Sequence, residues 1–110
     1  MKVPSVVADF YQSHSRPALD ASGKYLYDLM MPDDGQLRIY TLASALQLND
    51  DLDVGERLPG FFAVGDDAGE EILCVEVQTG SVVTVPLRPM TQEALPVAHS
   101  LAQVVANGVE

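Results

Sequence analysis

The chain has 110 residues, 47% of them hydrophobic, and sixteen acidic against six basic residues give it a formal net charge of −10. This length is typical of one domain and can bury a core without disulfides or a metal ion. The hydrophobic content excludes a disordered chain. The negative charge repels phosphate backbones, so we expect no direct nucleic-acid ligand and a protein partner with a basic face. Solubility alone is an equally good explanation of the charge.

The first residues indicate where the protein resides, and the segment around the single cysteine indicates the state of its thiol. The opening segment, MKVPSVVADFYQ, has no long apolar core and carries Asp9, which does not fit a secretory signal. No apolar run approaches the roughly 20 residues that a membrane helix needs. We therefore expect a cytoplasmic protein that does not enter a membrane. Cys74 lies in an apolar segment, where a thiol behaves as a small hydrophobic side chain, so we expect it to be buried and inert.

The first third of the chain begins with a predicted helix. Apolar residues recur there at helical spacing, namely Val3, Val6, Val7 and Phe10. Residues 14–17 end this helix, and residues 17–24 are typical of a loop. The segment Lys24–Met31 fits either a strand or two helical turns, and the alternation alone does not decide between them.

A turn, a strand and a short helix are predicted next. Residues 32–35, Pro-Asp-Asp-Gly, form a turn signal in which glycine accepts a positive φ. Residues 36–40 alternate between apolar and polar, which predicts a strand. Thr41 is placed to cap a short helix that carries Leu42, Ala45, Leu46 and Leu48.

The second half begins with a polar, acidic connection over residues 49–60, followed by three segments with strand character. Residues 61–64 are short and apolar, and the spacing of residues 72–77 and 81–87 predicts an antiparallel hairpin. A last helix is predicted to stop at Asn107-Gly108 and to present an apolar face made of Val97, Leu101, Val104 and Val105.

The order of these elements predicts an α+β domain. We expect an antiparallel sheet of at least four strands, with helices at the N- and C-terminal ends packed on one face. The predicted core contains Phe61, Val64, Leu73, Val75, Val83, Val85, Leu101 and Val105.

Two acidic clusters are the candidate functional residues. The first cluster, in the 49–60 connection, consists of Asp50, Asp51, Asp53 and Glu56. The second, between two predicted strands, consists of Asp66, Asp67, Glu70 and Glu71. Paired carboxylates can act as general acid and base, but only in a partly apolar site where a carboxyl pKa can rise. Gly65 and Gly69 predict a solvated turn instead, so we hypothesise that some of these carboxylates face a basic protein partner.

Metal and nucleotide motifs are incomplete or missing from the sequence. Asn49, Asp51 and Asp53 alternate as calcium ligands do, but Val54 and Gly60 replace the Gly and Glu that the loop requires. One cysteine and two histidines are too few for a zinc site. No GxSxG, GxGxxG or GxxxxGK(S/T) motif occurs. We therefore expect no cofactor and no metal ion, and a binding protein is favoured over a hydrolase or metal-dependent enzyme.

Several short motifs follow one another between residues 37 and 108. LRIYTL (37–42) has the form of a strand that enters a helix, and an asparagine ends that helix at position 49. LPGFFAVGD (58–66) is a strand that ends in Gly-Asp, residues 69–76 and 80–82 give the next strand, turn and strand, and VAHSL (97–101) opens the last helix. In this order they resemble the SUKH superfamily, the Smi/Knr-like and Syd-like domains. The N-terminal third departs from that pattern, and Leu101 replaces the usual aromatic residue.

The resemblance implies a single SUKH-like domain over residues 1–110 that binds another protein and has no common enzymatic activity. Many bacterial members resemble immunity proteins, which neutralise a polymorphic toxin, and fungal members are regulatory adaptors. The resemblance therefore predicts an immunity protein whose acidic surface covers a basic face of a toxin. A housekeeping adaptor of the same fold is the alternative, because a fold alone does not fix its partner. The oligomeric state stays open.

Overall fold

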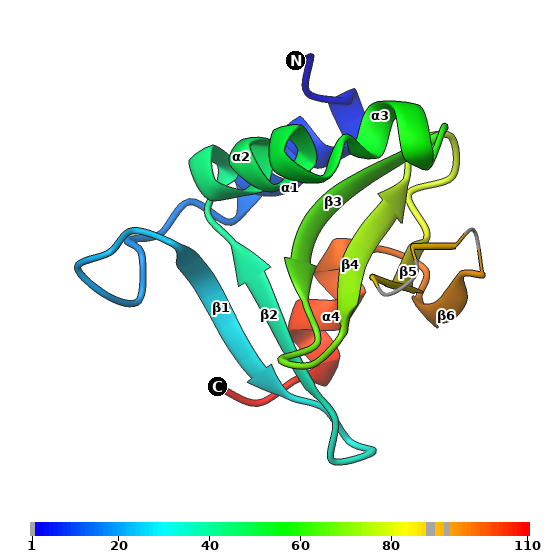
Figure 1. Ribbon diagram of the computed structural model, residues 1–110. Coiled ribbons are helices and arrows are strands. Elements are labelled where there is room, and N and C mark those ends of the chain that lie inside the picture. The colour runs from blue at the N-terminus through cyan, green and yellow to red at the C-terminus, as the bar shows by residue number, and fades with distance from the viewer. Residues whose placement is uncertain (1, 88–89, 92) are drawn as a thin grey trace.

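The fold is a curled six-stranded antiparallel sheet with four helices, seen in a computed structural model that describes residues 2–87, 90–91 and 93–110 (Figure 1). The strands are β1 (Tyr25–Met30), β2 (Gln36–Tyr40), β3 (Phe61–Asp66), β4 (Glu71–Glu76), β5 (Val82–Pro86) and β6 (Leu95–Ala98). The helices are α1 (Ser5–Ser13), α2 (Leu42–Leu52), α3 (Val54–Arg57) and α4 (Leu101–Asn107). The predicted α+β class is confirmed, and the ambiguous segment before residue 31 is a strand.

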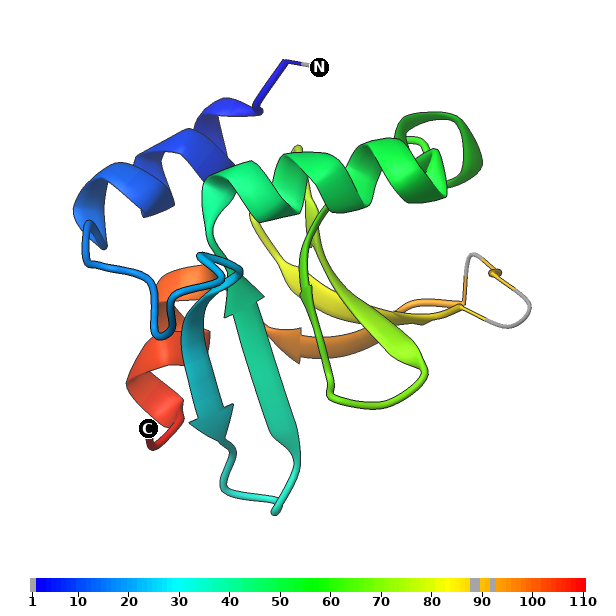
Figure 2. The ribbon, with the colours of Figure 1, turned by 60° about the vertical axis from the view of Figure 1, so that its left-hand side comes forward.

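The strands lie in the sheet in the order in which they occur in the chain, β1-β2-β3-β4-β5-β6. Each strand therefore pairs with the strands next to it in sequence, and the central hairpin of β4 and β5 has the predicted antiparallel pairing. The pairing of β2 with β3 is short, because only Arg38 with Asp66 and Ile39 with Gly65 face each other. Figure 2 shows the curl of the sheet, with α2 lying across one end of it.

A hydrophobic cluster packs on each face of the sheet. The larger cluster includes the buried residues of both terminal helices, α1 and α4, which confirms that these helices share one face. The smaller cluster contains Val54 and Leu58, from α3 and the residue after it. Because side chains alternate along a strand, Phe62 and Val64 of β3 join the larger cluster while Ala63 joins the smaller one.

The predicted core residues all contribute to these two clusters, to different extents. Phe61 and Val105 are only partly buried against them, whereas Phe62, next to Phe61 in β3, is buried. Cys74 is fully buried in the smaller cluster, as predicted. Burial raises the pKa of its thiol to about 12, which keeps the sulfur protonated at neutral pH.

The polar connection predicted over residues 49–60 is wrong. Helix α2 is capped by Thr41 as expected and continues to Leu52, and α3 follows after Asp53, which takes a left-handed φ of 56°. The Asn-Asp-Asp run has weak helix propensity and resembles a loop, but Ala45 and Asn49 face the interior one turn apart and hold the helix against the sheet.

The predicted start of the last helix is also wrong. Val97 and Pro96 belong to strand β6, and α4 begins only after Ser100, whose hydroxyl oxygen accepts a hydrogen bond from the Gln103 N–H at 3.1 Å. The serine cap sets this boundary. The proline is accommodated because β6 lies at the edge of the sheet, where one side of the strand needs no ladder hydrogen bond. The predicted stop at Asn107-Gly108 is confirmed.

Asn49 fixes α2 to β3 by two of its three side-chain hydrogen bonds. Its amide nitrogen donates to the carbonyl oxygens of Ala45 at 2.7 Å and Ala63 at 2.8 Å, and its Oδ1 accepts from the Ala63 N–H at 2.9 Å. The side-chain amide thus pairs with Ala63 as the backbone of a neighbouring strand would. This matters because β2 has already diverged from β3 at that point, and a buried N–H and C=O would otherwise lack partners.

Candidate partner-binding surfaces

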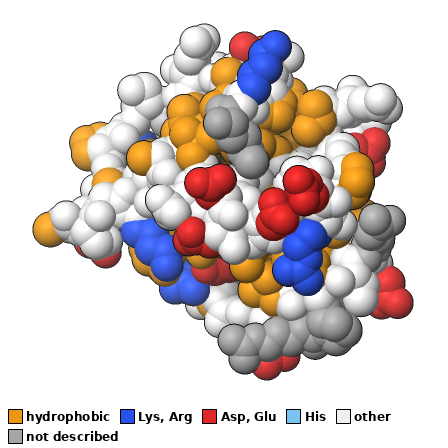
Figure 3. Space-filling view, turned by 45° about the horizontal axis from the view of Figure 1, so that its top comes forward, with side chains coloured by type: hydrophobic (Ala, Val, Ile, Leu, Met, Phe, Trp, Pro, Cys, Tyr) orange, Lys and Arg blue, Asp and Glu red, His pale blue; other side chains and the backbone are white. Residues whose placement is uncertain are grey.

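The first predicted acidic cluster lies on the helices rather than on a loop. We call it the α2–α3 surface, and it consists of Asp50, Asp51, Asp53 and Glu56. All four residues are exposed. Figure 3 shows carboxylates in the middle of the face that carries these helices, with basic side chains beside them. Asn49 and Asp51 lie on helix α2, so they do not belong to a loop of the kind in which alternating residues bind calcium.

The carboxylates of the α2–α3 surface are free of internal ion pairs within the described part of the chain. The ion pairs found there join Arg16 to Glu110 and Arg38 to Asp66. Asp51 accepts one hydrogen bond from its helical neighbour Gln47 at 2.8 Å, which is an exposed contact. No ion pair with a described residue therefore neutralises the charge of this surface.

Asp66 of the second cluster is used inside the fold. Its two carboxylate oxygens accept hydrogen bonds from Arg38, from Nε at 2.8 Å and from Nη2 at 3.2 Å. The Tyr40 hydroxyl donates to the same carboxylate at 2.5 Å. Only 15% of the Asp66 side chain is exposed. The prediction that water surrounds this carboxylate in a turn is wrong, because Asp66 is the last residue of β3 and pairs across to β2.

The surroundings of Asp66 keep it charged. Partial burial raises the pKa of the carboxyl, but the hydrogen bonds from Arg38, Tyr40 and the Ala68 N–H together outweigh burial and lower the pKa below its usual value. The same contact acts in the opposite direction on the phenol, since burial and then the hydrogen bond to Asp66 raise the pKa of Tyr40. This network joins β2 to β3 where the ladder between them is short.

The rest of the second cluster shapes the turn between β3 and β4. Oδ1 of Asp67 accepts hydrogen bonds from the N–H groups of Gly69 at 2.8 Å and Glu71 at 3.2 Å. Ala68, rather than a glycine, takes the positive φ in this turn. Glu70 is exposed, while Asp67 and Glu71 are half-buried.

Gly65 serves a close approach rather than a turn. It lies within β3, and a Cβ at this position would come within 1.8 Å of the Arg38 carbonyl oxygen. The glycine therefore lets the backbones of β2 and β3 meet at their short ladder.

The two acidic clusters do not form one surface. The α2–α3 surface precedes the start of β3 at Phe61, and the second cluster begins where β3 ends at Asp66. A strand of this length spans about 17 Å at 3.3 Å per residue. Figure 1 shows α3 and the β3–β4 turn at opposite ends of the strand. A partner that covers one cluster therefore need not touch the other.

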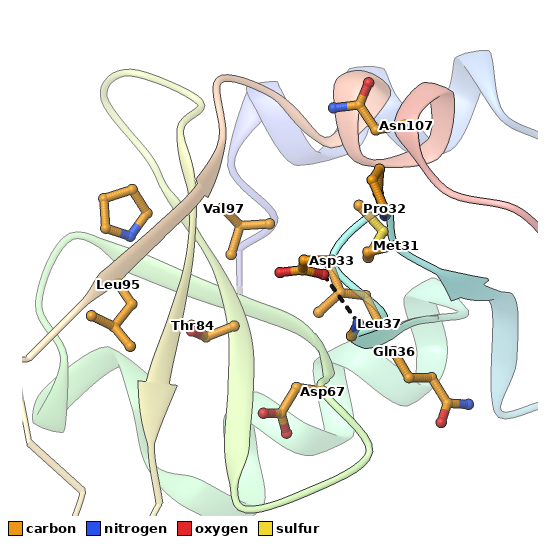
Figure 4. A pocket seen from close by; sticks show the side chains of 12 residues that line it. Met31, Pro32, Asp33, Gln36, Leu37, Asp67, Thr84, Leu95, Val97 and Asn107 are labelled. Atoms are coloured by element: carbon orange, nitrogen blue, oxygen red, sulfur yellow. Dashed lines mark hydrogen bonds between the residues drawn. The ribbon is translucent and has the colours of Figure 1, made fainter.

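A groove between the hairpin turns was not predicted from the sequence. We call it the hairpin groove; its volume is about 470 Å³. It runs between the β1–β2 turn, the β3–β4 turn and strand β6, and Figure 4 shows Asp33 and Asp67 on it together with Leu95 and Val97. Asp33 was interpreted only as a turn residue, since no spacing in the sequence links it to Asp67 or to β6.

Neither a metal centre nor a membrane helix is found among residues 2–87, 90–91 and 93–110. No group of three or more His, Cys, Asp or Glu side chains there is placed to hold a metal ion. No helix in the same residues is long and apolar enough to cross a membrane.

Comparisons with known proteins leave the family open. No protein-family model matches the chain, and no curated protein matches it either. The SUKH resemblance therefore stays a prediction that depends on the motifs between residues 37 and 108.

Proposed function

We propose that the protein is a non-catalytic binding domain whose α2–α3 surface meets a basic face of a protein partner. The observation that carries the proposal is that four exposed carboxylates sit together on helices, without an ion pair to any described residue. Asn49 holds α2 against the sheet, so these charges are presented on a rigid support. A fixed negative surface speeds association with a basic partner and selects against acidic ones.

The hairpin groove holds its two carboxylates within their own turns. Its two carboxylates each accept a hydrogen bond from a backbone N–H of their own turn, Asp33 from Gly35 at 3.0 Å and Asp67 from Gly69 at 2.8 Å. These contacts fix the position of both carboxylates at the groove.

Toxin neutralisation is the specific form of binding that we propose, and the SUKH-like motifs support it. In this role the α2–α3 surface would cover the basic active-site face of a toxin, such as a nuclease, and keep substrate out. The direct test is to express a toxin encoded beside this gene with and without the protein. We expect growth to be rescued when both are present. Unrescued growth with every neighbouring reading frame would contradict an immunity role.

Charge neutralisation tests which surface is used once a complex is in hand. The test variant carries Asp50→Asn, Asp51→Asn, Asp53→Asn and Glu56→Gln. The matched control removes the same number of exposed charges elsewhere through Asp9→Asn, Asp20→Asn, Asp34→Asn and Glu93→Gln. We expect the test variant to associate about tenfold more slowly at low salt, with a weaker salt dependence than the control. Equal rates for the two variants would show that net charge, rather than this surface, steers the partner.

A further inference from the structure

We propose that the hairpin groove is a second binding site, which takes an extended protein segment carrying a lysine or arginine beside an apolar side chain. The site goes beyond the proposed function, because the groove adjoins the β3–β4 turn, at the opposite end of β3 from the α2–α3 surface. The inference depends on an exposed apolar wall, two carboxylates and a groove that continues along β6.

The apolar wall comes from β6. Leu95 is 59% exposed although it belongs to a strand, and Val97 of the same strand lines the same groove. Leu37 of β2, which is buried, also lines the groove. An exposed leucine beside a hollow of this kind is a place where an apolar side chain of a partner loses contact with water.

The charge of the groove selects the partner. Asp33 and Asp67 reach it from two different turns, and no lysine, arginine or histidine is among the residues that line it, all of which the structure describes. A guanidinium or ammonium group placed there gains charge-assisted hydrogen bonds. A second copy of this chain is a poor occupant, because it would bring another net charge of −10 to the contact.

The groove is long enough for an extended segment. A neighbouring hollow of about 540 Å³ shares Pro96, Val97 and Asn107 with it and includes Glu76. A segment laid along the four residues of β6 spans about 10 Å, at 3.3 Å per residue. Pro96 has no N–H, so the outer edge of β6 cannot offer a complete ladder to an added strand. Side chains, rather than strand addition, therefore carry the recognition.

The probe is the capped peptide acetyl-Gly-Val-Arg-Leu-Gly-amide, titrated into the isotope-labelled protein and followed by amide chemical shifts. We expect saturable shifts confined to Asp33–Leu37, Asp67 and the β6 amides of Leu95 and Val97. The charge-reversed peptide, with Glu in place of Arg, should produce none. Absence of saturable shifts with the arginine peptide, or shifts that map to the α2–α3 surface, would overturn the proposal.

Asparagine substitutions separate charge from fold at this site. Asp33→Asn and Asp67→Asn remove the charges and keep Oδ1, which accepts the N–H of Gly35 or Gly69, so the turns persist. We expect the double variant to bind the arginine peptide at least about tenfold more weakly. The matched control Asp34→Asn removes a charge in the same turn, at an exposed residue that does not line the groove and whose positive φ asparagine tolerates. An equal loss in that control would overturn the site.

Serine substitutions test the apolar wall. Leu95→Ser should weaken binding of the arginine peptide. Leu19→Ser should not, because it changes a leucine that lies outside the groove and is 45% exposed. Equal effects of the two serine variants would contradict a role for β6. If the groove binds no peptide, the proposed function is unaffected, because that function is tested by toxin rescue and by variants of the α2–α3 surface.

Discussion

Polar side chains bind strand β3 to a neighbouring element near each of its ends. The two contacts differ in charge, and we call them the neutral tie and the charged tie. Towards its start, the neutral amide of Asn49 pairs with Ala63. At its end, the Asp66 carboxylate forms an ion pair with Arg38 and accepts the Tyr40 hydroxyl. The neutral tie involves no carboxylate, so the nearby acidic residues form no ion pair through it. The charged tie, in contrast, occupies the carboxylate of Asp66. Two acidic runs that look alike in sequence therefore differ in what they can offer a partner.

The largest expected effect is at the neutral tie. Asn49→Ala would leave the N–H and C=O of Ala63 without partners in a fully buried position. We expect the free energy of unfolding to fall by about 3 kcal/mol, measured by urea denaturation at pH 7. Gln47→Ala, at an exposed position of the same helix, serves as control and should change stability by less than about 0.5 kcal/mol. Equal stabilities would show that α2 does not depend on this amide.

The charged tie should come next. Asp66→Asn keeps the size of the side chain but leaves the Arg38 guanidinium half-buried without its carboxylate. We expect a loss of about 2 kcal/mol in the free energy of unfolding. Adding Arg38→Met to this variant should recover part of the loss, because it removes the unpaired cation. Additive losses in the double variant would mean that the ion pair contributes no coupling.

Lowering the pH should weaken the charged tie and change the neutral tie far less. The Asp66 pKa is lower in the folded than in the unfolded protein, so its stabilising contribution is complete above the unfolded pKa near 3.8 and is lost as the pH falls through the folded pKa. The stability difference between wild type and Asp66→Asn should thus be constant from pH 7 to about 5 and shrink below about pH 4. The difference cancels effects of the other carboxylates. The Asn49→Ala difference should change far less over the same range.

The smallest effect on stability is expected at the α2–α3 surface. Neutralising its four carboxylates removes no ion pair to a described residue, and relieves repulsion in a chain of net charge −10. We expect the free energy of unfolding to change by less than about 0.5 kcal/mol, in either direction. A loss above 1 kcal/mol would show that these residues support the fold and are poor reporters of binding.

Sequence patterns predicted those elements whose periodicity and local signals agree. The alternation in β2, the apolar character and spacing of β4 and β5, and the Thr41 cap gave segments close to those observed. The pattern failed where tertiary contacts override propensity, as in the continuation of α2 through Asp50 and Asp51. It failed again at Val97, whose spacing suits a helix although the Ser100 cap begins α4 later.

The candidate sites were less predictable than the fold. The residues of the α2–α3 surface were identified, but as a loop, and the internal role of Asp66 was missed because its partners Arg38 and Tyr40 precede it by more than twenty residues. The hairpin groove brings Asp33, Asp67 and Leu95 together from three turns or strands. Such a convergence depends on sheet curl and register, which no local pattern in a single sequence contains.

The meander order of the sheet has a consequence for how the chain folds. Every strand pairs with its neighbour in sequence, and every ladder except that of β2 with β3, which α2 and α3 separate, closes over a short connection with a small loop-closure cost, which favours fast folding. The larger hydrophobic cluster is different, because it joins Val7 and Phe10 to Leu101 and Val104, at opposite ends of the chain. During synthesis the hairpins can pair as they leave the ribosome, whereas the larger cluster is complete only after α4 has emerged. Stalled or truncated chains that lack α4 should therefore be the aggregation-prone species of this protein.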